Sequence, residues 1–388
     1  MEFTLTEEQL AVKEAARDFA QQELLPGVIE RDRDMKFAKE QIAMMGELGF
    51  LGMMVDPQYN GGGMDTLSYV VAMEEISKVD NSASVCMSVN NSLVCWGLET
   101  YGNEEQKQKY LTRLATGEWI GAFCLSEPEA GSDATSQRTT AIDMGDHYLL
   151  NGTKNWITNG GSSNLHVVIA QTDRDKGHRG INALIVETSW DGVDIGAKED
   201  KLGIRSSDTH TIIYNDVKVP KENRIGEDGF GFKFAMKVLS GGRIGIAAQA
   251  LGIAQGAYEL AVKYSKERTT FGEPICNHQA IAFKLADMAT EIEAARLLVY
   301  RSAWMKDQGL DYTSAASMAK LFASETAMKH TIEAVQIHGG YGYVKEYHVE
   351  RLLRDAKITQ IYEGTSEIQR MVISRNVLRG QLYEPILG

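Results

Sequence analysis

The stretch IGIAAQALGIAQGAY, residues 244–258, decides the architecture of the C-terminal third of this chain. Its apolar side chains recur at the spacing of one helix face, at Ile244, Ala247, Ala248, Leu251 and Tyr258. Residues 281–299 repeat the pattern in a second run, with Ile281, Leu285, Met288, Ile292, Ala295 and Val299. Long uninterrupted runs of this kind are typical of antiparallel helices, so residues 229–388 are predicted to form a helix bundle.

Upstream of this region the sequence changes to shorter segments. Residues 121–228 contain β-rich runs at 165–171, 181–187 and 209–219, bounded by Gly, Asn and Asp. The pair Asn151-Gly152 separates two apolar segments, and both residues tolerate the positive φ that a two-residue hairpin turn requires. A hairpin is therefore predicted at Asn151-Gly152, inside a small β domain.

The first 120 residues are again mostly helical in pattern. Thr6, with Gln9 three residues later, forms a capping box, and Leu10, Ala15 and Phe19 continue at helical spacing. A loop at 56–63, with three consecutive glycines, precedes a second helical run at 67–79. The order of helices, sheet and helices predicts an α+β protein, mostly α, with domains at 1–120, 121–228 and 229–388.

The composition limits the partners and the location of the protein. A net charge of -13 argues against nucleic acid, because duplex binding requires a basic surface. The longest apolar stretches, 165–170 and 181–186, are far shorter than the roughly 20 residues of a membrane helix, so no membrane span is predicted. The N-terminal sequence MEFTLTEE is acidic and shows no secretory or organellar leader. We expect a cytoplasmic bacterial protein, or a mitochondrial matrix protein if the chain is a processed eukaryotic one.

The cysteines give no sign of a metal site or a disulfide framework. There are four, and none of them has CxxC spacing: Cys86, Cys95, Cys124 and Cys276. We expect them to be reduced, and no metal is predicted.

Two segments in the β region are candidates for ligand contact. Residues 123–133 read FCLSEPEAGSD, where Pro, Gly and small polar residues follow an apolar strand and suit a loop whose backbone approaches a ligand. The alternative is an ordinary turn. Residues 156–161, WITNGG, place an aromatic ring and a hydroxyl beside a flexible turn, which suits a flat heterocycle. The alternative there is a tryptophan buried for packing.

A third candidate is the segment IYEGTSEIQR, residues 361–370. Ser366 and Gln369 have capping-box spacing, so a helix is predicted to begin at Ser366. Glu363 then lies just outside the helix, on a turn that contains Gly364. A carboxylate there is either a catalytic base or a charge that stabilises the helix end, and the local pattern leaves both open.

Taken together, the three segments resemble the acyl-CoA dehydrogenase family over essentially the whole chain. The LSEP and GSD residues of 125–133 resemble its first signature. QIHGGYG at 336–342, through Arg354-Asp355 to Glu363-Gly364-Thr365, resembles the second. RIGIA at 243–247 and VNNSL at 89–93 are most similar to its short-chain, butyryl-CoA members.

The resemblance implies an N-terminal helical domain, a middle β-barrel or sandwich and a C-terminal four-helix bundle. It implies a homotetramer with FAD between domains and across a subunit interface. It also implies FAD contacts of three kinds: Leu125, Ser126, Trp156 and Thr158 around the isoalloxazine, with Thr158 at N5 and Ser132 near phosphate; Arg268, Phe271, Gln336 and Gly340 from the neighbouring subunit; and Thr365 and Glu367 at the adenosine end.

The activity implied is the α,β-dehydrogenation of a short acyl-CoA, butyryl-CoA favoured, to a trans-2-enoyl-CoA in fatty acid β-oxidation. Glu363 is the implied base, and hydride passes from Cβ to flavin N5. The backbone N–H of Glu363 and a ribityl hydroxyl are the implied oxyanion donors. Ser132, Arg243 and Gly364 are implied to contact substrate, although Ser240 departs from the acidic residue of many relatives. Gly242 stands where other branches carry their base.

Several alternatives remain at this stage. A dicarboxylic substrate is disfavoured because residues 81–86 contain no cation. Trp96 either shortens the acyl pocket or packs in the core. Electron-transfer flavoprotein is the implied electron acceptor, and an acyl-CoA oxidase is less favoured because the extra C-terminal domain of those relatives is lacking. A medium- or branched-chain dehydrogenase, an enoyl-CoA reductase in a bifurcating complex, and a catalytically silent flavin or acyl-CoA binding protein stay open.

Overall fold

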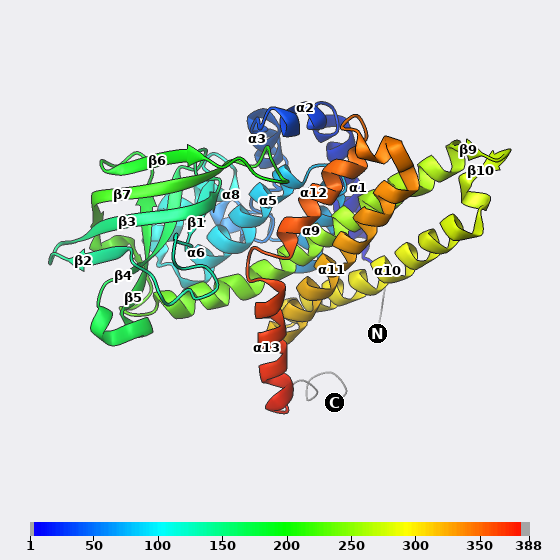
Figure 1. Ribbon diagram of the computed structural model, residues 1–388. Helices are drawn as coiled ribbons and strands as arrows, with labels where there is room; N and C mark the ends of the chain where they lie inside the picture. The colour runs from blue at the N-terminus through cyan, green and yellow to red at the C-terminus, as the bar shows by residue number, and fades with distance from the viewer. Residues whose placement is uncertain (1–3, 382–388) are drawn as a thin grey trace.

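The computed structural model describes residues 4–381, and its elements fall into the order helices, sheet, helices (Figure 1). The fold class predicted from the sequence is confirmed. No helix in the described residues is long and apolar enough to cross a membrane. The domain limits of 1–120, 121–228 and 229–388 remain a prediction, which we keep as a proposal.

The N-terminal part is built of short helices with three π-helical segments. The predicted capping box is confirmed at its start, because Thr6 Oγ1 accepts from the Gln9 N–H at 3.2 Å while Gln9 Oε1 accepts from the Thr6 N–H. The elements are α1 (Glu7–Phe19), η1 (Ala20–Leu24), α2 (Val28–Arg33), α3 (Lys39–Glu47), η2 (Pro57–Tyr59), α4 (Thr66–Ser77), α5 (Asn81–Ser88), η3 (Val89–Cys95), α6 (Trp96–Tyr101), α7 (Glu104–Gln106), η4 (Lys107–Leu111) and α8 (Thr112–Ala115).

The middle part is one eight-stranded sheet in the order β6-β7-β3-β2-β4-β5-β8, with β1 pairing in parallel with β4. The three predicted strand runs are confirmed at β4, β5 and β7. The elements are β1 (Gly121–Cys124), β2 (Thr140–Asp143), β3 (His147–Thr158), β4 (Leu165–Gln171), η5 (Arg174–Gly180), β5 (Ile181–Glu187), β6 (Val193–Lys198), β7 (Thr209–Pro220), η6 (Lys221–Asn223) and β8 (Arg224–Ile225).

The hairpin predicted at Asn151-Gly152 is wrong. Both residues lie inside β3, where the pairing with β7 shifts register between Leu150 and Gly152. Asn151 binds Asp216 on β7, with its Nδ2 2.9 Å from Asp216 Oδ1. A Cβ on Gly152 would lie 2.5 Å from Thr139 Oγ1, so the glycine admits a close approach of two backbones rather than a turn.

The C-terminal part is dominated by long helices. α9, α10, α11 and α12 pack together as the predicted bundle, and α13 projects away from it (Figure 1). The elements are α9 (Gly231–Glu267), β9 (Thr269–Thr270), β10 (Glu273–Pro274), η7 (Ile275–Asn277), α10 (Gln279–Asp307), α11 (Thr313–His338), η8 (Gly339–Tyr343), α12 (His348–Thr359) and α13 (Ser366–Leu378).

The predicted capping box of α13 is one residue out. Thr365, not Ser366, is the N-cap, and its Oγ1 accepts from the Ile368 N–H at 3.3 Å. The Gln369 amide does not return to the N-cap backbone. It donates instead to Gly364 O at 2.8 Å, inside the turn that carries Glu363.

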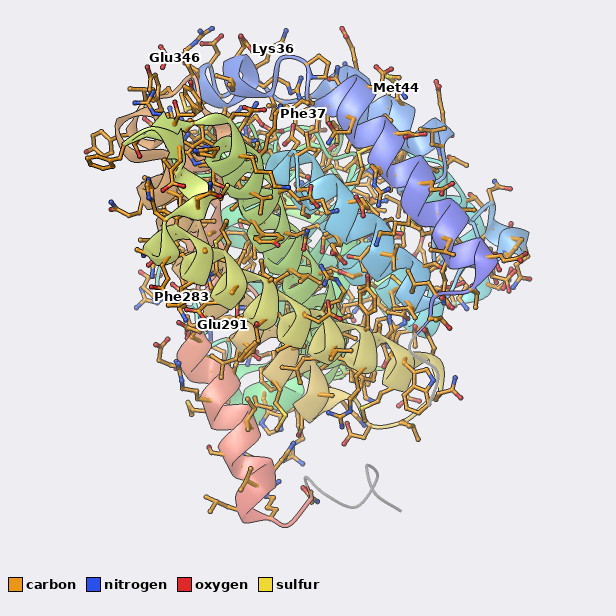
Figure 2. The ribbon with its side chains drawn as sticks, turned by 90° about the vertical axis from the view of Figure 1, so that its right-hand side faces the viewer. Lys36, Phe37, Met44, Phe283, Glu291 and Glu346 are labelled. Carbon is orange, nitrogen blue, oxygen red and sulfur yellow. The ribbon has the colours of Figure 1, made fainter. Side chains whose placement is uncertain are left out.

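Helix α9 connects the three parts of the fold. It runs from the sheet to the β9–β10 hairpin at the opposite end of the molecule, and it packs against α4, α10, α11 and α12 (Figure 1). Residues 241–254 of α9 are buried without interruption. Figure 2 views the molecule from the hairpin side, where Phe283 of α10 is exposed. The middle of α9 is therefore the part of the fold that any internal site must share.

Candidate active site

Glu363 lies on the turn between α12 and α13, next to α9. Its backbone has φ 52° and that of Gly364 has φ 90°, so two consecutive residues are left-handed. Glycine adopts this conformation freely, whereas a glutamate does so only when its surroundings enforce it. The Gly364 carbonyl accepts two hydrogen bonds, from Lys320 Nζ at 2.5 Å and from Gln369 Nε2 at 2.8 Å. These bonds fix the turn.

The Glu363 carboxylate points at α9. A Cβ built on Gly242 would lie 2.1 Å from Glu363 Oε2 and 2.7 Å from Leu93 Cδ2, so only glycine leaves room for the carboxylate. Glu363 Oε2 is buried and has no hydrogen-bond partner in the described protein. A buried carboxylate oxygen without a partner is costly unless the group is protonated or awaits a ligand.

Burial raises the pKa of the Glu363 carboxyl to about 7, against the opposing charges of Lys320 and Arg243. Arg243 is 7% exposed, and burial lowers the pKa of its guanidinium. Its one hydrogen bond to a side chain, from Nη1 to Ser317 Oγ, is long at 3.4 Å, and its Nε has no partner in the described residues. The Glu363 carboxyl therefore changes protonation near neutral pH. The Arg243 guanidinium keeps an N–H group that donates to no partner in the described residues.

A buried polar layer lies on the other side of the turn. The Tyr362 hydroxyl donates to Gln249 Oε1 on α9, and Gln249 Nε2 donates to Asn81 O and Ser84 Oγ, both at 3.0 Å. Beside it, the Tyr69 hydroxyl donates to Ser88 Oγ at 3.1 Å. These hydrogen bonds tie the turn that carries Glu363 to α9 and, through Gln249, to α5.

The loop that follows β1 is fixed by a buried ion pair. Lys154 Nζ on β3 lies 2.7 Å from Glu127 Oε1, and it also donates to Leu125 O at 3.0 Å. The Asn155 N–H donates to Ser126 O at 2.9 Å. Glu127 in turn accepts from the N–H groups that follow on the same loop. Residues 125–127 are therefore held against β3 by these bonds, and a turn follows at residues 127–130.

Trp156 and Thr158 lie at the end of β3, beyond this segment. Trp156 has φ 58° at a register shift of the strand and is 56% exposed, unlike a tryptophan that packs in a core. An exposed indole at this irregular point of the strand is available to a flat ring system such as an isoalloxazine. Leu125 and Tyr362 pack against the same buried cluster, which contains Leu93, so this surface and the Glu363 turn share one apolar core.

A third group of predicted residues lies at the far end of the bundle. Arg268 directly follows α9, and Phe271 is 99% exposed with φ 52° in the β9–β10 hairpin. Gln336 lies in the last turn of α11, and Gly340 lies in η8. The hairpin and the sheet are at opposite ends of the molecule (Figure 1). Within one chain these residues do not meet Trp156, which fits a site completed by a second copy.

The remaining predicted residues are dispersed. Ser132 is exposed in the loop before β2, and Glu367 is exposed in the first turn of α13. Thr365 caps α13, as described above. The structure brings Glu363, Gly364 and Arg243 together and separately brings Leu125 and Ser126 to β3, whereas Ser132 and Glu367 join neither group through a hydrogen bond in the described residues.

Two further residues of the site were missed by sequence reasoning. Lys320 lies on α11 among the buried alanines Ala316, Ala319 and Ala323, and a lysine on an apolar helix face was a signal that could have found it. Gln249 interrupts the apolar run of α9 in the same way. A polar residue in the middle of a buried stripe indicates a specific partner, although it does not identify which one.

Three family models match the chain in order. They are "Acyl-CoA dehydrogenase, N-terminal domain" over residues 6–118, "Acyl-CoA dehydrogenase, middle domain" over 122–217 and "Acyl-CoA dehydrogenase, C-terminal domain" over 229–378. The chain belongs to the acyl-CoA dehydrogenase family. The predicted resemblance is therefore confirmed, and the protein is a flavoprotein oxidoreductase of this family.

Similar proteins extend over the full length of this acyl-CoA dehydrogenase. "Acyl-CoA dehydrogenase, short-chain specific" from Clostridium acetobutylicum is 50% identical over 98% of this chain and 100% of its own. The solved structure of butyryl-CoA dehydrogenase from Megasphaera elsdenii is 49% identical, with a TM-score of 0.96 over 98% of this chain and 100% of that one.

A chain in a second solved structure is 52% identical, with a TM-score of 0.97 over 98% of this chain and 100% of its own. That structure is described as "Electron transferring flavoprotein of Acidaminococcus fermentans: Towards a mechanism of flavin-based electron bifurcation".

Proposed function

We propose that this acyl-CoA dehydrogenase converts a short-chain acyl-CoA, butyryl-CoA favoured, into its trans-2-enoyl-CoA, with Glu363 as the base. The observation that carries the proposal is the Glu363 carboxylate, whose Oε2 is buried without a hydrogen-bond partner and whose pKa is raised to about 7. A base with this pKa is half ionised at neutral pH, which is where a general base acts best.

In the proposed reaction, Glu363 Oε2 takes the α-proton of the thioester. As the proton leaves, negative charge develops on the thioester oxygen, and the backbone N–H of Glu363 is the protein donor proposed to receive it. The left-handed turn fixes that N–H relative to the carboxylate, because both belong to one clamped residue. When bound, FAD supplies the two-electron acceptor that takes the β-hydrogen as hydride.

The chain's own residues fit FAD at two separate surfaces. Leu125, Ser126, Trp156 and Thr158 are proposed to hold the flavin ring, and the exposed indole of Trp156 supports this. A second chain is proposed to contribute Arg268, Phe271, Gln336 and Gly340, since these lie at the opposite end of the bundle. Ser132 is proposed near phosphate, and Thr365 and Glu367 near adenosine. A homotetramer then completes each site.

The proposed substrate is a short acyl-CoA. The names of the C. acetobutylicum and M. elsdenii relatives agree with a short substrate. Arg243, Gly364 and Ser132 are proposed to contact the CoA thioester. A medium- or branched-chain substrate remains the alternative.

An electron-transfer flavoprotein is the proposed electron partner. One similar chain was solved in a study of such a flavoprotein and electron bifurcation, which also favours a second candidate function, reduction of an enoyl-CoA in a bifurcating complex. The same base would then return the proton to Cα. We propose a cytoplasmic location in a bacterium, or the mitochondrial matrix for a processed eukaryotic chain.

The test is anaerobic reduction of the purified flavoprotein. Butyryl-CoA is expected to bleach the flavin absorbance of the wild-type protein but not that of Glu363→Gln, which keeps the shape of the side chain and cannot act as base. If only a longer or branched thioester bleaches the flavin, the substrate assignment is wrong. If Glu363→Gln is bleached as fast as the wild type, or if the chain binds no flavin, the proposed mechanism is wrong.

A further inference from the structure

Lys320 is a fully buried lysine on α11, and its side chain reaches the turn that carries the proposed base, Glu363. It lies on α11 between the buried alanines Ala316 and Ala323, and its Nζ donates to Gly364 O at 2.5 Å. It forms no ion pair within 4.0 Å in residues 4–381. A buried ammonium bonded to a carbonyl is costly, and an apolar side chain of similar volume would fill the same space at lower cost. The charge therefore requires an explanation.

The explanation lies in what the Lys320 ammonium faces. It binds the carbonyl of Gly364, which directly follows Glu363, and its charge acts on the Glu363 carboxylate together with that of Arg243. Burial opposes the ionised form of Glu363, while an opposite charge nearby favours it. Lys320 on α11 and Arg243 on α9 are thus the two cations whose charge favours the ionised Glu363 carboxylate.

We propose that Lys320 is a positioning residue for the base, which clamps the left-handed Glu363-Gly364 turn through the Gly364 carbonyl and favours the ionised carboxylate through its charge. The inference rests on the proposed role of Glu363 and deepens it. Gln369 shares the first task, because its amide donates to the same carbonyl at 2.8 Å, but it is neutral and cannot share the second. Lys320 and Gln369 therefore form a matched pair for mutation, because both donate to the Gly364 carbonyl and only Lys320 is charged.

The charged groups around Glu363 decide in which direction its pKa shifts when Lys320 is replaced. The titratable or charged side chains that face Glu363 or Lys320 from the packed elements are Arg243 on α9, Tyr69 on α4, Tyr362 on the turn and Glu367 on α13. Glu367 is exposed, and the two tyrosines are neutral near pH 7. Burial lowers the pKa of Lys320 itself to about 7, so its charge and that of Glu363 support each other around neutrality.

The experiment compares Lys320→Met with Gln369→Met across pH. Loss of the cation should move the acidic limb of the kcat/KM profile for butyryl-CoA to higher pH by about one unit, with about a tenfold loss below that limb and recovery at alkaline pH. Gln369→Met loses a donor to the same carbonyl without a change of charge. It should lower kcat/KM by a similar factor at every pH and leave the limb in place. Lys320→Arg should restore the limb toward the wild-type position.

Several outcomes would overturn the proposal. An acidic limb that stays in place in Lys320→Met, or that moves equally in Gln369→Met, means that the charge of Lys320 does not act on the base. Flavin content and thermal unfolding report whether each variant folds, and Lys320→Gln, which keeps a donor, replaces Lys320→Met if that variant does not fold. If neither neutral variant folds while Gln369→Met does, Lys320 is a structural residue and the proposal is wrong.

Different results would contradict the proposal for Glu363 and the proposal for Lys320. Activity retained in Glu363→Gln would contradict the assignment of Glu363 as the base. An inactive Glu363→Gln, together with an acidic limb that does not move in Lys320→Met, would contradict only the role proposed for Lys320.

Discussion

Gly242 and Glu363 are complementary in space: a Cβ on Gly242 would lie 2.1 Å from Glu363 Oε2. Glycine inside a helix costs about 1 kcal/mol relative to alanine, so a glycine in the middle of α9 needs a compensating gain. The gain here is room for a carboxylate from another element. Position 242 is also where other family branches are implied to carry their base. A base at 242 and a base at 363 would require the same space.

The first prediction follows from this packing. Gly242→Ala should push the Glu363 carboxylate aside and lower kcat/KM for butyryl-CoA by about 10²-fold, because a displacement of about 1 Å is enough for such a loss. Flavin content should stay near that of the wild type. Gly241→Ala is the matched control, since a Cβ there would meet only Tyr312 Oη at 3.7 Å and Lys306 Nζ at 3.8 Å. Equal activity of both variants would contradict the packing argument.

The second prediction concerns stability and pH. The folded state holds the pKa of Glu363 at about 7, above its ordinary value of 4.5. Between these two values the unfolded chain has released a proton that the folded protein keeps, so stability falls as pH rises through this window. Above pH 7 the folded protein has lost about 1 to 3 kcal/mol relative to acidic conditions.

Glu363→Gln cannot ionise and should avoid that loss. Its apparent Tm is expected to exceed that of the wild type by a few degrees at pH 8 and to differ little at pH 4.5, where both side chains are neutral. Differential scanning calorimetry at the two pH values measures this directly. A constant difference in Tm at both pH values would mean that Glu363 is not the group responsible.

Much of the fold follows from local sequence patterns. The predicted runs at β4 and β5 are exact to the residue because continuous apolar strands bounded by Gly and Asp have few alternatives. The capping box at Thr6 was likewise predicted from the sequence and is confirmed. The failure at Asn151-Gly152 has a physical cause: the same pair also suits a strand in which the glycine admits close backbone packing and the pairing shifts register, and the partner strand β7 decides.

The site was predictable only in part. The resemblance gave Glu363, and the structure supplies the reason why it can act as a base, which is burial with no partner on Oε2. Lys320 was not found, because its contact with Gly364 spans 44 residues of sequence and depends on how α11 packs on the turn. The sequence does show a lysine among alanines on one helix face, but it does not show which group that lysine binds. Arg268 and Phe271 were implied for a second subunit, and the β9–β10 hairpin lies at the end of the molecule opposite the sheet (Figure 1).

The third prediction tests the ion pair between Lys154 and Glu127. Lys154→Met leaves the Glu127 carboxylate buried without its partner, which should destabilise the protein by about 3 to 5 kcal/mol and reduce flavin content, because Leu125 O also loses its donor. Lys154→Met combined with Glu127→Leu should recover part of the stability but not the flavin affinity. Denaturation and flavin absorbance measure the two effects.

The control for this ion pair is an exposed one. Lys176 lies 3.1 Å from Asp173, with both side chains largely in solvent, and Lys176→Met should cost less than about 1 kcal/mol. If Lys154→Met costs no more than Lys176→Met and keeps its flavin, the ion pair does not fix the loop at residues 125–127.

The fourth prediction tests whether two chains complete each site. Arg268→Ala keeps its own Glu363, and Glu363→Gln keeps its own Arg268, so each variant alone should be inactive. In a random mixed assembly, about a quarter of sites combine a Glu363 from one chain with an Arg268 from its partner, if the site is shared across a symmetric interface. Co-expression of the two variants should therefore restore about a quarter of wild-type activity.

The co-expression experiment separates the two arrangements, because an Arg268 that serves its own chain predicts no recovery of activity. If Arg268 served the site of its own chain, no chain in the mixture would carry both intact residues, and activity would stay at the level of the single variants. Separately purified variants, mixed without dissociation, provide the control, since their assemblies cannot exchange partners. Recovery in the co-expressed sample alone would place the β9–β10 hairpin at a neighbouring chain's flavin. Its absence would require the hairpin to have another role, because Phe271 stands 99% exposed at the end of the bundle.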